Sequence, residues 1–210
     1  MSNRFLTRQP LALIAGIMLL LAGAVSAEEV DYEALGKQGI EAYHKGDLIR
    51  AMQLLERSAE HGYAPAQTTL AYFLDKSDLD QQAFQWYSKA AEQGDAGGQF
   101  GVAQMYALGE GVDKNEDLAR EWMLKAVAQN HPDALRMYAD AMEKGALGVA
   151  MNRQKALDIY QDCHAKGDMA CTRRLVLAYR FGQLGLPVDE KKAQQLNIDM
   201  FRREEKPEKK

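Results

Sequence analysis

Residues 98–130 read GQFGVAQMYALGEGVDKNEDLAREWMLKAVAQN, and two helical patterns follow each other there with a glycine-containing loop between them. Four, five and eight residues after Gly98 stand Val102, Ala103 and Tyr106, a spacing that places them on one face of an α-helix. A second apolar stripe follows the loop and consists of Ala119, Trp122, Met123, Ala126 and Val127. The stretch therefore predicts a helical hairpin in which small side chains alternate with large ones.

The same hairpin pattern recurs along the chain. The residues that end it, Gly62, Gly94, Asn130 and Gly167, are 32, 36 and 37 positions apart. Glycine and asparagine are the residues that most readily adopt the left-handed conformation at a helix C-terminus. Because a hairpin with one apolar face cannot bury that face alone, copies at a near-constant interval predict a stack in which each hairpin packs on its neighbours.

Each unit repeats two further features. A small residue opens every first helix, and Asp or Asn precedes every second helix, where its side chain can accept hydrogen bonds from free backbone N–H groups. The opening residues are Ala66, Gly98, Ala134 and Cys171. The expected capping residues are Asp80, Asn115, Asn152 and Asp189.

This combination of small residues, aromatic residues and paired glycines closely resembles the Sel-1-like repeat family, which is related to the tetratricopeptide repeats. The resemblance extends from Ala66 to about Phe201, whereas the opening unit around Gly39–Asp47 looks more like a tetratricopeptide unit. The resemblance implies an all-α fold of ten helices, arranged as about five antiparallel pairs in a right-handed superhelix. It also implies that the first helices of the pairs line a concave face.

The chain divides into three expected parts. A leader covers 1–27, a helical repeat domain covers 28–201, and a charged flexible tail covers 202–210. The expected repeat units are approximately 31–65, 66–97, 98–133, 134–170 and 171–201.

The leader has the three parts of a secretory signal peptide. Arg4 and Arg8 form a basic head, Leu11–Ala24 is apolar, and small residues lead to an expected cleavage site after Ala27. The apolar run is shorter than the roughly 20 residues of a permanent membrane helix. We therefore expect export to the periplasm or the medium, with an uncleaved signal anchor as the alternative.

Charge and motifs restrict the class of partner. The net charge of −4 disfavours nucleic acid, which requires a basic footprint. No His-x-x-x-His pair is present, and we expect neither a metal nor a cofactor. The remaining expectation for a helical repeat is a protein or an extended peptide as partner, with no stable membrane span once the leader is cleaved.

Two cysteines flank the turn at Gly167. Cys163 stands where Ala126 stands in the preceding unit, and Cys171 stands where Ala134 stands, so both occupy inward positions on adjacent helices. An even number of cysteines in an exported chain points to a disulfide, and secreted members of the resembled family bridge cysteines at this spacing. Redox catalysis and metal binding are the competing interpretations, but no Cys-x-x-Cys motif is present.

Candidate partner-binding residues are those of the first helices that fall outside the apolar stripe. Aromatic, Met and Arg side chains at such positions are typical of protein interfaces. The alternative is that they pack between neighbouring units. The candidates are Phe73, Phe100, Met105, Arg136, Met137 and Arg173.

The sequence favours a binding scaffold that uses the concave face, and two other functions stay open. One is an enzyme acting on cell-wall material or β-lactams, because some cysteine-rich members of the resembled family have been linked to such activity. The other is a regulatory module of envelope stress or secretion. The part of the chain after the leader contains no Ser-x-x-Lys and no Gly-x-Ser-x-Gly, so we assign no catalytic residue.

A chromogenic cephalosporin distinguishes the scaffold from the enzyme. Because no activated serine is recognisable, we expect the purified chain to hydrolyse nitrocefin at the buffer rate. Saturable turnover that survives repeated purification would contradict this expectation.

Overall fold

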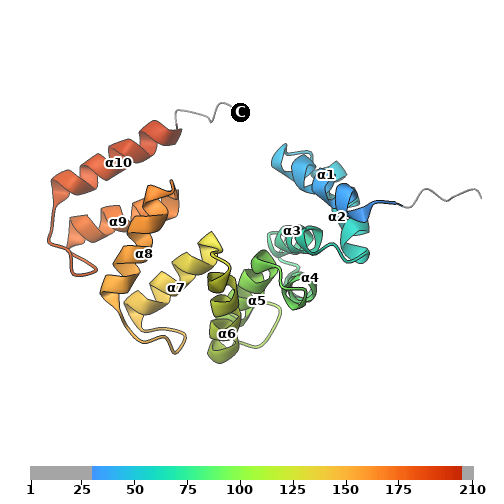
Figure 1. Cartoon of the computed structure of the whole chain (residues 1–210), viewed down its shortest axis with the longest axis horizontal. Helices are drawn as coiled ribbons and strands as arrows, with labels where there is room; N and C mark the ends of the chain where they lie inside the picture. The colour runs from blue at the N-terminus through green and yellow to red at the C-terminus, as the bar shows by residue number, and fades with distance from the viewer. Residues whose placement is uncertain (1–29, 205–210) are drawn as a thin grey trace, which may run out of the picture. The chain divides into compact units, whose positions relative to one another are not determined.

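The computed structural model describes residues 30–204, and every regular element in that range is an α-helix (Figure 1). These helices belong to one compact unit that begins at Tyr32. The expectation of an all-α fold built from five antiparallel pairs is confirmed, whereas the expected leader lies outside the described residues. The helices are α1 (Tyr32–His44), α2 (Leu48–Glu60), α3 (Ala64–Asp75), α4 (Asp80–Glu92), α5 (Ala96–Leu108), α6 (Glu116–Ala128), α7 (Pro132–Lys144), α8 (Arg153–Ala165), α9 (Met169–Phe181) and α10 (Glu190–Glu204).

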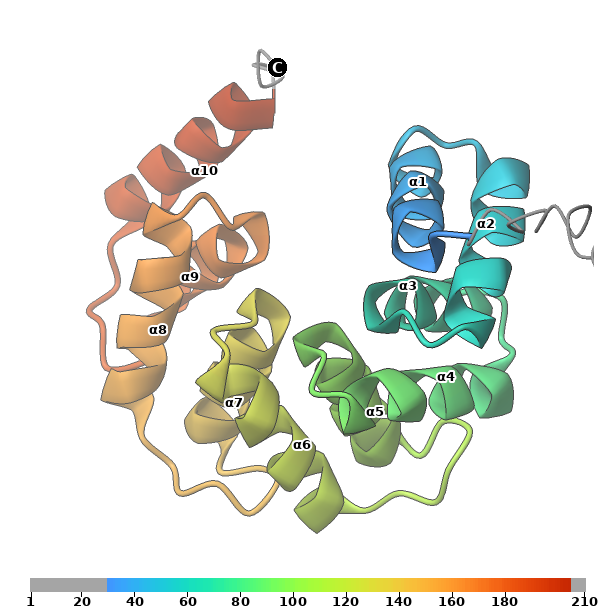
Figure 2. The same ribbon diagram turned by 45° about the vertical axis from the view of Figure 1, so that its right-hand side comes forward.

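Each helix packs mainly on the helix before it and the helix after it. The first helices of neighbouring pairs also touch, because α1 contacts α3 and α3 contacts α5. Within this unit, Figure 2 shows the pairs following one another in a curved row. The first helices therefore lie on the inner side of the curve, as the resemblance implied.

Small residues permit this close packing. Ala66, Ala103 and Ala134 have no exposed surface, and each lies where two helices meet. At Gly101 of α5, an added Cβ would lie 2.4 Å from the ring of Tyr87, so only glycine lets that ring lie against the helix.

The turns and caps follow the sequence pattern with one exception. Asn130 and Gly167 have φ angles of 59° and 94°, in the left-handed region expected at a helix C-terminus. Asn115 and Asn152 accept hydrogen bonds from the backbone at the starts of α6 and α8. The expectation for Asp80 is wrong, because this residue is the first of α4 and its side chain does not cap the helix.

The last helix is longer than expected. The sequence predicts that the charged tail starts at 202, but α10 continues to Glu204. Arg and Glu are good helix formers, and Arg202 lies 4.0 Å from Asp199 one turn earlier, which favours continuation. None of the helices within residues 30–204 has the length and hydropathy needed to cross a bilayer.

The predicted disulfide is confirmed. Cys163 of α8 and Cys171 of α9 are bonded, with their Cα atoms 6.1 Å apart. Both side chains are buried and belong to the apolar core of the last two pairs. The bond therefore closes a short loop between two helices that already pack on each other.

Reduction should destabilise the fold without unfolding it. Opening so short a loop removes about 2.5 kcal/mol in the chain-entropy model. We expect the free energy of unfolding, measured by urea denaturation, to fall by that amount when the protein is reduced. The double variant Cys163→Ala/Cys171→Ala is the control, and a response of this variant to the reductant would contradict the assignment.

Candidate functional site

Three adjoining hollows meet at Gln104, in the middle of α5. They have volumes of about 250, 350 and 240 Å³, and we call the surface that they form the inner groove. The first lies between α1, α3 and α5, and is lined by Tyr43, His44, Thr68, Thr69, Tyr72, Tyr87, Gly97, Phe100, Gln104, His131 and Asp133. The second is lined by Asp75, Lys76, Asp78, Asp80, Tyr87, Gly101, Gln104, Met105, Leu108 and Glu110. The third lies between α5 and α7, and is lined by Phe100, Gln104, Ala107, Leu108, Asp133, Arg136, Met137 and Asp140.

Aromatic rings form the walls of the groove. Tyr43 and Tyr72 meet edge to face with their ring centroids 6.3 Å apart, and Phe100 stacks on His131 at 5.1 Å. Tyr87 is buried at the bottom, where burial and, secondly, the nearby Asp75 carboxylate raise the pKa of its hydroxyl. The ring of Tyr72 remains 42% exposed, so part of the wall is accessible to a partner.

A contact between repeats borders the groove in three successive units. The residue two positions after the opening small residue meets the N-cap of the next first helix. Thr68 donates a hydrogen bond of 2.7 Å to Asp95, Phe100 stacks on His131, and Arg136 forms an ion pair of 2.5 Å with Asp168. We call these three pairs the N-cap contacts: Thr68–Asp95, Phe100–His131 and Arg136–Asp168.

Two of the N-cap residues, His131 and Asp168, have protonation states that let them accept hydrogen bonds from the backbone. His131 caps α7 by accepting from the Ala134 N–H, which requires a neutral ring, and burial lowers its pKa despite the nearby Asp133. Burial acts to raise the pKa of Asp168, but the Cys171 N–H and the Arg136 guanidinium outweigh it, so the pKa is lowered. Each cap is thus held in the state that can accept a hydrogen bond.

The structure separates the six candidate residues into two groups. Phe100, Arg136 and Met137 line the third hollow of the inner groove, and Met105 lines the second. Phe73 is half-buried and borders none of its hollows, and Arg173 is exposed on α9 away from it. Placing Met105 outside the apolar stripe is wrong, because it is 1% exposed and belongs to the core.

The sequence reasoning missed Tyr43, Tyr72 and Gln104. Aligning the first helices places Met105 level with Phe73, Ala141 and Ala178, and the two alanines at this position are buried. That alignment could have assigned Met105 to the core and Gln104, one residue earlier, to the surface.

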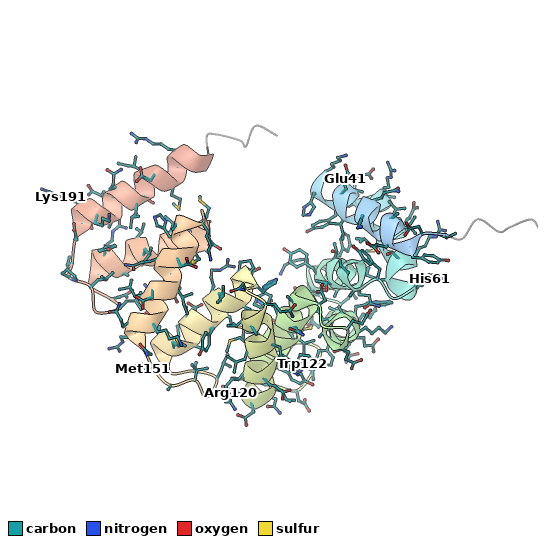
Figure 3. All side chains as sticks on the ribbon, viewed as in Figure 1. Glu41, His61, Arg120, Trp122, Met151 and Lys191 are labelled. Atoms are coloured by element: carbon teal, nitrogen blue, oxygen red, sulfur yellow. A yellow bond between two sulfur atoms is a disulfide. The ribbon has the colours of Figure 1, made fainter. Side chains whose placement is uncertain are left out.

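Other conspicuous side chains lie elsewhere. Trp122 of α6 is labelled in Figure 3 and lies under the ammonium of Lys125 at 3.7 Å, and it lines none of the three hollows. Within residues 30–204, no three His, Cys, Asp or Glu side chains are placed to hold a metal ion together.

Comparison with known proteins decides the family. Five stretches of the chain match the Sel1 repeat, and together they cover more than half of it. The chain belongs to the Sel1 repeat family. The first stretch shows that the opening unit, whose sequence looks more like a tetratricopeptide unit, is a Sel1 repeat as well. The matched stretches are 34–63, 64–95, 96–131, 132–161 and 174–196.

Individual relatives agree with this assignment. An uncharacterized protein of Neisseria meningitidis serogroup B is 30% identical over 63% of this Sel1 repeat chain, which spans 28% of that protein. An ERAD-associated E3 ubiquitin-protein ligase component of Arabidopsis thaliana is 28% identical over 51% of the chain, which spans 18% of it. The crystal structure of a Sel1 repeat protein from Oxalobacter formigenes has a TM-score of 0.70 and 23% identity, covering 85% of this chain and 72% of its own. The last similarity supports the fold alone.

The ion pair between Arg136 and Asp168 should stabilise the last two repeats. Arg136→Met removes a charged partner from a half-buried carboxylate, so we expect a loss of about 1–2 kcal/mol at pH 7. Folding lowers the pKa of Asp168, so the ion pair stabilises the fold fully at pH values above the pKa that Asp168 has in the unfolded chain. This stabilisation is lost as the pH falls through the lower pKa that Asp168 has in the folded protein. The difference from the wild type should therefore shrink towards pH 2.

Arg173→Met is the matched control for this measurement. Arg173 occupies the same repeat position in the unit formed by α9 and α10, it is exposed, and within residues 30–204 no further first helix follows this unit. Urea denaturation of both variants across the pH range gives the comparison. Equal losses of stability in the two variants would contradict the role of the Arg136 pair.

Proposed function

We propose that this Sel1 repeat chain is a non-catalytic scaffold that holds an extended segment of a partner protein in the inner groove. The observation that carries the proposal is the run of three hollows around Gln104, walled by partly exposed rings. Gln104 is exposed, and its carboxamide makes no hydrogen bond within the part of the chain that the structure describes. A carboxamide can donate and accept at once, as pairing with a peptide backbone requires.

Family membership supports a binding role over an enzymatic one. Helical repeats present extended surfaces to other proteins, and the Arabidopsis relative is named as a component of a larger ligase. Fold similarity by itself does not establish function, so the groove carries the argument.

We also propose that the chain works outside the cytoplasm, in the periplasm or the medium. The disulfide between Cys163 and Cys171 supports this location, since such bonds persist in oxidising compartments. The basic and apolar pattern of the first 27 residues supports it independently.

Site-specific photo-crosslinking tests the groove. A photoreactive residue in place of Gln104 should give discrete adducts in cells that express the full chain, because a bound segment would pass over this position. The same residue in place of Gln85, which is exposed on α4 and lines none of the three hollows, is the control. Adding Tyr72→Ala should reduce the adducts at Gln104 several-fold, with folding verified by circular dichroism. Equal adducts at both positions, or none at Gln104, would reject the proposed site.

A further inference from the structure

We propose that the inner groove selects a cationic segment, in which Lys or Arg side chains alternate with apolar ones. This inference rests on the proposed function and specifies the chemistry of the partner. It follows from the balance of charge along the groove, from an ammonium–ring contact already present there, and from the polar group at its centre.

The groove has an excess of negative charge. Among the described residues that line its three hollows, six are carboxylates and two are Lys or Arg. The carboxylates form two groups, one around the loops that follow α3 and α5 and the other along α7. They are Asp75, Asp78, Asp80, Glu110, Asp133 and Asp140.

The two cations are already engaged. Lys76 lies 3.2 Å from Asp75, and Arg136 pairs with Asp133 and Asp168. Within residues 30–204, by contrast, Asp78 and Glu110 make no ion pair, and both are exposed, although the Glu110 carboxylate is near enough to Lys76 to contribute to the raised pKa of that lysine. Exposed carboxylates that form no ion pair, beside an apolar wall, attract a segment of opposite charge and disfavour an acidic one.

The chain itself shows how an ammonium fits this surface. Lys76 places its Nζ atom 5.3 Å from the ring centroid of Tyr72 while it contacts the carboxylate of Asp75. An ammonium or guanidinium held between a ring and a carboxylate gains from both the π-face and the charge. Tyr43 and Phe100 offer further rings along the same groove.

The groove fits a peptide better than a small cation. Gln104 stands between the three hollows, where its carboxamide can pair with backbone N–H and C=O groups. Leu108 and Met137 add apolar surface in the third hollow, which suits the aliphatic side chains of a segment. Successive side chains of one extended segment would thus occupy successive hollows.

Three fluorescein-labelled peptides of equal length test the inference on the full folded chain. They share the same Leu positions and differ only at the intervening positions, which carry Lys and Arg, Gln, or Glu. We expect the basic peptide to bind at least tenfold more tightly than the neutral one in fluorescence anisotropy. The acidic peptide should bind more weakly still, and higher salt should reduce the preference.

Matched charge variants locate the effect. Asp78→Asn/Glu110→Gln removes two carboxylates from the groove, and asparagine tolerates the positive φ of 57° at position 78. Glu56→Gln/Glu92→Gln changes the net charge equally at exposed sites on α2 and α4. We expect the first double variant to weaken binding of the basic peptide about fivefold, since it removes two exposed carboxylates that can pair with the cations of the peptide. The second should leave binding unchanged.

The outcomes separate the inference from the proposed function. If the basic and neutral peptides bind equally and Tyr72→Ala weakens both, the groove binds peptides but the cationic preference is wrong. If Tyr72→Ala affects no peptide, the groove itself is rejected. Equal weakening by both double variants would show a general effect of net charge and overturn the inference.

Discussion

Burial of small side chains between neighbouring hairpins is the constraint on which the structure depends. Alanines such as Ala66, Ala103 and Ala156 are fully buried, and the large side chains of adjacent helices pack against them. A single hairpin has no second layer, so its apolar face is covered only when another hairpin stacks on it. The curved row of pairs and its inner surface follow from this requirement.

The three N-cap contacts join equivalent positions of successive repeats, and each contact is a different type of interaction. A hydroxyl–carboxylate bond, a stacked ring pair and an ion pair stand at equivalent places in consecutive units. Each pair matches chemically, although its members lie in different repeats. The backbone geometry of the repeat therefore determines where the contact forms. The side chains at that position differ only in the type of interaction that they make.

These contacts also restrict what the inner groove offers to a partner. Arg136 lines the groove, yet its guanidinium is held by two carboxylates of its own chain. Phe100 presents a ring that stacks on His131. Exposed groups without such partners, among them Gln104 and Glu110, are therefore the ones available for recognition.

The helices, their pairing, their serial stacking and the bonded cysteines could all be predicted from the amino-acid sequence. Periodicity, left-handed turn residues and equivalent positions are local or repeated features, and each can be recognised without coordinates. Among the candidate partner-binding residues predicted from the sequence, Phe100, Arg136 and Met137 line the inner groove, and their role in binding stays a prediction. The burial of Met105 and the exposure of Gln104, by contrast, follow from how the helices pack on one another. Adjacent residues on a helix differ by about 100° in direction. At the edge of an apolar stripe, the packing of the neighbouring repeat determines which of the two is covered, and Met105 belongs to one core cluster with Leu74 and Tyr87 of the preceding pair.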